Sequence, residues 1–112
     1  MNPENLRLIV LIKDTCPKDL VPLITAHVPM LTFRKFYWSP LMDRWFWSPL
    51  QKTVVCKVTE QQFEKAKTYG AHFALTEAHR PELGELGLGF EVREEYHKFF
   101  KYLTLWKFED EK

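Results

Sequence analysis

The feature that most constrains the fold is a run of apolar residues near the start of the chain. Residues 6–12 read Leu-Arg-Leu-Ile-Val-Leu-Ile and contain neither glycine nor proline. A half-exposed strand alternates apolar and polar side chains, whereas this run is apolar at nearly every position. The run therefore predicts a strand that is buried in a sheet.

The rest of the chain alternates between strand and helix patterns. Four further strands are predicted at 52–58, 71–76, 86–90 and 102–106. Helices are predicted from residue 19 to residue 28, over 41–47, over 59–69 and over 92–100. This alternation predicts a single α/β domain over 1–112, with a mixed, mostly parallel sheet and helices on both faces.

The helix ends carry specific signals. Asp19 is a candidate N-cap and Pro22 lies in the first turn, whereas Pro29 should end this helix because it cannot donate the next hydrogen bond. Thr59 and Gln62 have the spacing of a capping box, in which each side chain accepts from the backbone N–H of the other residue.

Composition excludes several classes of protein. The 112 residues are 46% hydrophobic and 15% aromatic, which suffices for one core and is too apolar for a disordered chain. With a net charge of +1, nucleic-acid binding would need a local basic patch. No stretch is long enough to span a membrane or to form a signal-peptide core, which predicts a cytoplasmic protein.

The cysteines and histidines give no metal-binding pattern. The 2 cysteines, Cys16 and Cys56, and the 4 histidines are scattered along the chain, without the spacing of metal ligands. We therefore expect no metal, no cofactor and two reduced thiols.

An aromatic segment occupies residues 33–50. It contains two nearly identical blocks, FYWSPL at 36–41 and WFWSPL at 45–50. Basic residues interleave with the aromatics, a pattern typical of surfaces that stack unpaired bases and neutralise phosphates. The candidate RNA-binding residues are Arg34, Lys35, Trp38 and Trp45. Aromatics also anchor protein interfaces and homodimers, and half of these could instead line the core.

A histidine and a carboxylate are expected to meet at one edge of the sheet. His27 lies in the first helix, on a face that it should share with Leu20, Leu23 and Ile24. Glu77 directly follows the strand 71–76. Ligands of open α/β sheets bind where strands end, and an imidazole beside a carboxylate can transfer protons there.

The second half of the chain resembles the type-2 peptidyl-tRNA hydrolase family, including its short hydrolase-domain-containing branch. Residues 51–58 are similar to the family's Lys-Val-Val strand, and 77–82 are similar to its Asp-Ala-Gly-Arg-Thr-Gln loop. Residues 100–106 resemble its final Leu-x-Leu strand.

The first half adds two matches. Residues 24–27 fall where the family has its Ala-Gln-x-x-His helix, and Lys18 falls on the first lysine of its Gly-Lys-Gly-Lys turn. The resemblance implies hydrolysis of the ester between a peptide or aminoacyl group and tRNA, without a cofactor. It implies that His27, Glu77 and Lys18 are catalytic and that Arg80 binds the substrate.

Several positions depart from the family pattern. Leu20 stands at the second lysine, Glu77 replaces an aspartate, and Pro81 replaces a threonine. The helix glutamine is also absent. A relative that lacks these polar groups can keep the fold and lose the chemistry. The alternative hypothesis is therefore that the protein is an inactive relative that binds RNA or a protein through 33–50. A third hypothesis is a structural domain that self-associates.

Each candidate residue also has a purely structural interpretation. His27 on an apolar face would be a core or edge histidine. Glu77 and Arg80 are spaced to pair with each other within a turn, a contact of little energetic weight when exposed. Lys18 would then be a solvated turn residue.

Overall fold

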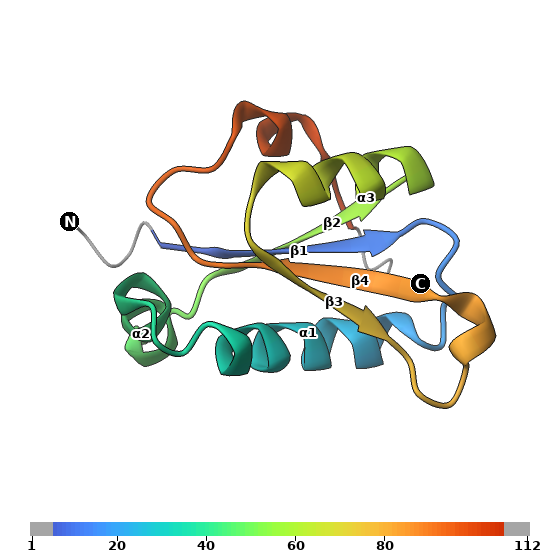
Figure 1. The fold of residues 1–112 in the computed structure, drawn as a ribbon, viewed down its shortest axis with the longest axis horizontal. Helices are drawn as coiled ribbons and strands as arrows, with labels where there is room; N and C mark the ends of the chain where they lie inside the picture. Colours follow the sequence, from blue (N-terminus) through green and yellow to red (C-terminus); the bar gives the residue numbers. More distant parts are fainter. Residues whose placement is uncertain (1–5, 107–112) are drawn as a thin grey trace, which may run out of the picture.

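The computed structural model describes residues 6–106, which form a five-stranded sheet with helices on both faces (Figure 1). The elements follow the order β1 (Leu8–Lys13), α1 (Val21–Lys35), α2 (Pro40–Trp47), β2 (Thr53–Val58), α3 (Glu60–Ala66), β3 (His72–Thr76), β4 (Glu85–Phe90) and β5 (Thr104–Leu105). Short 3₁₀ helices cover Lys67–Tyr69, Pro81–Leu83 and Lys98–Tyr102. The predicted alternation of strands and helices is confirmed from β1 to β4.

The sheet has the strand order β3-β4-β1-β2-β5. β1 and β2 run parallel, whereas β1–β4, β3–β4 and β2–β5 are antiparallel pairs. The prediction of a mostly parallel sheet is therefore wrong, because the sheet is mixed and mostly antiparallel. The reason is that the short β3–β4 connection folds back as a hairpin, and β4 then returns beside β1.

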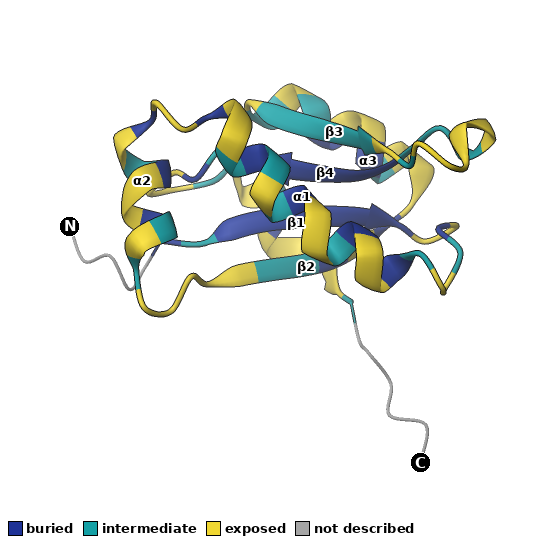
Figure 2. Ribbon diagram, turned by 90° about the horizontal axis from the view of Figure 1, so that it is seen from below, coloured by how far each residue is buried: buried dark blue, intermediate teal, exposed yellow. Residues whose placement is uncertain are grey.

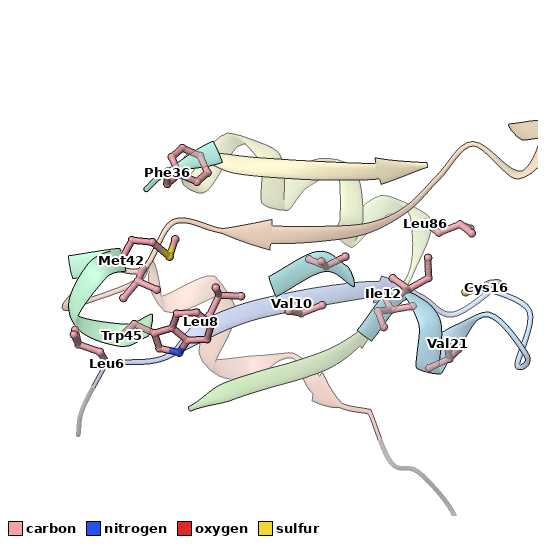
Figure 3. Close-up of a cluster of buried hydrophobic side chains, with 13 residues drawn as sticks. Leu6, Leu8, Val10, Ile12, Cys16, Val21, Phe36, Met42, Trp45 and Leu86 are labelled. Carbon is pink, nitrogen blue, oxygen red and sulfur yellow. The ribbon is translucent and has the colours of Figure 1, made fainter. Parts of the chain in front are cut away.

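Alternate side chains of β1 enter two separate cores, as the apolar run predicts. Leu8, Val10 and Ile12 pack with residues of α1 and α2 (Figure 3). Ile9 and Leu11 lie on the opposite face, with residues of α3 and the 3₁₀ helix Lys98–Tyr102. All six residues of β1 are buried, so this strand carries both layers of the domain.

Helix α1 lies close against β4 because two glycines leave room for it. A Cβ on Gly87 would meet Ile24 Cγ2 at 2.7 Å, and a Cβ on Gly89 would collide with Thr32. This packing extends α1 to Lys35, so the prediction that Pro29 ends the helix is wrong. Burial of one helix face outweighs the hydrogen bond that a proline removes.

The two predicted helix-start signals differ in outcome. Leu20, and not Asp19, is the N-cap of α1, and it makes no side-chain cap. In contrast, the capping box of α3 is confirmed, because Thr59 Oγ1 accepts from the Gln62 N–H and Gln62 Oε1 accepts from the Thr59 N–H.

The helix predicted over 92–100 is wrong. Only the last part of this stretch is helical, in the 3₁₀ turn Lys98–Tyr102. Its apolar residues serve opposite faces of the sheet, since Val92 packs in the core under α1 and Phe100 packs in the core under α3. The chain passes around the end of the sheet between them (Figure 1). The apolar residues of this stretch therefore have the spacing of one helical face although they pack on opposite sides of the sheet.

Candidate functional site

His27 lies in the middle of α1, on a side of the helix that is exposed to solvent. The buried positions of α1 are Val21, Ile24, Val28 and Thr32. The prediction of a shared face is therefore wrong, because Ile24 is buried whereas Leu23 and His27 are exposed. Exposed and buried stretches follow one another along the α1 ribbon (Figure 2). The imidazole is open to water and ligands, so the interpretation of His27 as a core residue is also wrong.

Lys18 lies in the turn that joins β1 to α1. The Leu20 N–H donates to the Pro17 carbonyl at 2.9 Å and closes the turn. Lys18 and its neighbour Asp19 are both exposed. The turn thus presents an ammonium group and a carboxylate at the edge of the sheet where β1 ends.

Glu77 follows β3 and organises the β3–β4 loop. Its carbonyl accepts from the Arg80 N–H at 3.0 Å, and its half-buried side chain accepts from the His79 N–H at 3.3 Å. The Arg80 guanidinium instead pairs with Glu82, with Nε 2.8 Å from Oε2. The ion pair that spacing suggested between Glu77 and Arg80 is therefore replaced by one between Arg80 and Glu82.

Charge and packing bring the turn before α1 close to the loop after β3. Glu82 raises the pKa of Arg80 through its hydrogen bond and charge, and the Asp19 carboxylate from the turn contributes further to the rise. Leu20 from the turn and Leu83 from the loop also pack against the same core cluster. The two segments therefore share one end of the domain.

The candidate RNA-binding residues of the aromatic segment lie at the other end of α1. This helix has 15 residues, so its ends are roughly 20 Å apart at a rise of about 1.5 Å per residue. Lys35 Nζ donates to the His72 carbonyl at 2.7 Å, at the start of β3, while Arg34 and Trp38 are exposed. The predicted site is thus divided into two groups, with His27 on the helix between them.

Trp45 belongs to the core and not to the surface. It is 3% exposed, and its indole Nε1 donates to the Lys52 carbonyl at 2.6 Å (Figure 3). A ring in this position has no face available for stacking on a base, which removes Trp45 from the candidate RNA-binding residues. Within the two aromatic blocks, the exposed rings are Tyr37, Trp38 and Trp47.

A groove that the sequence analysis missed lies beside Trp38. It has a volume of about 610 Å³, with one wall formed by 38–41 and the other by 91–95. A smaller cleft of about 250 Å³ shares Glu94 and Glu95 with it. The acidic sequence Glu-Val-Arg-Glu-Glu at 91–95 could have indicated this wall of the groove. The prediction of a helix over 92–100 instead placed these residues away from the aromatic segment.

The described residues contain no candidate metal site. Between residues 6 and 106, no three His, Cys, Asp or Glu side chains gather in a way that could hold a metal ion. Cys16 and Cys56 are free, buried thiols, and burial raises the pKa of Cys56 to about 11. In the same part of the chain, every helix is too short or too polar to cross a membrane.

The fold defines the protein as a single α/β domain with a five-stranded mixed sheet and an exposed histidine on its first helix. No protein-family model matches the sequence, and no curated protein is significantly similar to it. The activity must therefore be inferred from the residues of this chain.

Proposed function

We propose that the protein is a divergent peptidyl-tRNA hydrolase-like enzyme, which cleaves the ester between a peptide or aminoacyl group and tRNA. The observation that carries the proposal is that the turn containing Asp19 and the loop containing Arg80 lie at the same end of the domain, where α1 begins (Figure 1). This arrangement gathers cations and carboxylates beside the helix that presents the exposed His27.

Each residue has a role that ester hydrolysis requires. His27 takes a proton from a water molecule while the water oxygen attacks the ester carbonyl carbon. Lys18 stabilises the negative charge that develops on the carbonyl oxygen, and Glu77 orients the imidazole or the water. As the bond to the tRNA 3′ oxygen breaks, the imidazolium returns the proton to that oxygen.

Arg80 is assigned to phosphate binding. Its guanidinium pairs with Glu82 in an exposed position, and pairs of this kind contribute little to stability. A phosphate can therefore replace Glu82 as the partner of Arg80 at small energetic cost.

The test is release of tRNA from peptidyl-tRNA by the purified protein. His27→Ala should reduce the rate by about 10²–10⁴-fold, because it removes the general base. Met30→Ala is the matched control, since Met30 is exposed on the same helix and has no proposed role. Equal rates for wild type and His27→Ala, with both folded by circular dichroism, would remove His27 from the mechanism.

The second candidate function is binding without turnover, through the aromatic segment 33–50. It is favoured by the exposure of Trp38 and Trp47, which are 65% and 74% exposed. This function predicts RNA or protein binding that Trp38→Ala weakens and His27→Ala leaves unchanged. Binding of RNA would fall steeply as salt rises, whereas an apolar protein contact would respond weakly.

A further inference from the structure

The groove beside Trp38 combines an aromatic wall with an acidic wall. We propose that it binds a basic polypeptide segment of a protein partner, with a lysine or arginine side chain lying on the Trp38 ring between Glu91, Glu94 and Glu95. This inference goes beyond the proposed hydrolase activity and does not depend on it.

The aromatic wall is held in place by the core beneath it. Trp38 is 65% exposed, and its ring meets the buried Phe36 ring edge-on, with centroids 6.3 Å apart. Pro40 and Leu41 continue this wall. A ring that is positioned on one side and open on the other suits the aliphatic stem and the cationic head of a basic side chain.

The acidic wall is anchored at both of its ends. Val92 is 1% exposed, and the Tyr96 hydroxyl lies 3.0 Å from the carbonyls of Arg7 and Glu91, to one or the other of which it donates. Between these anchors the chain carries exposed side chains along the groove. The wall is therefore positioned although it has no helix or strand.

The charge of the groove favours a cation. Its lining contains the three carboxylates of Glu91, Glu94 and Glu95 and the single guanidinium of Arg93, which gives a formal charge of −2. Among residues 6–106, the ion pairs join other side chains and include none of these three glutamates. Within this part of the chain no cationic side chain lies within ion-pair distance of these carboxylates, so a basic ligand can supply the cation.

The amino end of α2 also lines the groove, and it offers little to an anion. Pro40 has no backbone N–H, and the Met42 N–H donates to Ser39 Oγ at 3.3 Å. Phosphates would therefore face three carboxylates with few compensating donors. This opposes the expectation that Trp38 stacks on RNA and favours a basic protein segment as the occupant.

The size of the groove is suitable for such a segment. A volume of about 610 Å³ lies within the range of clefts that hold ligands of a few side chains, about 300–1,000 Å³. An extended peptide presents alternate side chains to one surface. The basic residues of an alternating basic and apolar sequence can therefore all face the groove, where their aliphatic stems contact the aromatic wall and their charges the acidic wall.

The experiment uses an end-capped pentapeptide of alternating lysine and leucine, titrated into the 112-residue protein and followed by amide shifts in NMR. Shifts should concentrate in 38–41 and 91–95. The double variant Glu94→Gln/Glu95→Gln should weaken binding about tenfold, and Trp38→Ala about fivefold. The matched controls Glu64→Gln, on α3, and Tyr37→Ala, exposed beside Trp38, should bind as wild type does.

Two further ligands decide the chemistry of the occupant. A glutamate-leucine pentapeptide and a short oligouridine should leave the groove residues unperturbed. The proposal is overturned if the basic peptide shifts residues elsewhere or causes no shift at millimolar concentration. It is also overturned if oligouridine binds the groove as tightly, an outcome that would assign Trp38 to RNA.

Discussion

The two aromatic blocks at 36–41 and 45–50 have nearly the same sequence and opposite local structures. In the first block, Ser39 is the N-cap of α2, and its Oγ accepts from the Met42 N–H. In the second, Ser48 follows the last residue of α2, and its Oγ accepts from the Leu50 N–H at 3.2 Å. The same Ser-Pro-Leu sequence therefore lies at the start of α2 in the first block and at its end in the second.

The difference shows how much the following residues decide. After the first block the chain continues with Met42 and Trp45, which are three residues apart and both buried, so one face of a helix is fixed to the core. After the second block come Gln51, with a φ of 41°, and Lys52, which lead into β2. A serine can cap a helix only where packing supports the turns that follow.

The largest expected effect separates the buried and exposed tryptophans of the second block. Trp45→Ala should lower the free energy of unfolding by about 3–5 kcal/mol, because it leaves a cavity and removes the hydrogen bond that the indole donates to the Lys52 carbonyl. Trp47→Ala should change it by less than about 0.5 kcal/mol, since that ring is 74% exposed. Urea unfolding measures both, and similar losses would contradict the assignment of Trp45 to the core.

An intermediate effect is expected at the second position of each block. Phe46 stacks on Phe33, with ring centroids 4.2 Å apart and planes at 18°, whereas Tyr37 is 68% exposed. Phe46→Ala should cost about 2 kcal/mol and Tyr37→Ala less than about 0.5 kcal/mol. If denaturant midpoints of the two variants coincide, the blocks do not differ at this position.

The smallest effect concerns the two serines. Ser39→Ala removes an N-cap and should cost about 1 kcal/mol, with a loss of helical signal in circular dichroism. Ser48→Ala removes only a turn contact and should cost less than about 0.5 kcal/mol. A larger loss for Ser48→Ala than for Ser39→Ala would contradict the assignment of Ser39 as the serine that stabilises α2.

Features with a local cause could be predicted from the sequence. The buried strand β1, the helix over 40–47 and the capping box at Thr59 each depend on residues within a few positions of one another, and all are present. The continuation of α1 past Pro29 was not predictable in this way, because it depends on Gly87 and Gly89, which are nearly sixty residues away in the chain.

The candidate site was predictable in part, for the same reason. The turn before α1 and the loop after β3 follow strand ends, and both lie at one end of the domain. The exposure of His27 and the burial of Trp45 depend on which side of each helix meets the sheet. The groove beside Trp38 was missed because its acidic wall comes from a segment that has no regular structure.

The positions of the strands and of most helices follow from the order of residues alone, because apolar spacing and capping act between neighbouring residues. Tertiary structure alone decided the strand directions, the length of α1 and the path of 91–97 around the end of the sheet. These features depend on contacts between distant segments, where burial of apolar surface outweighs local preference.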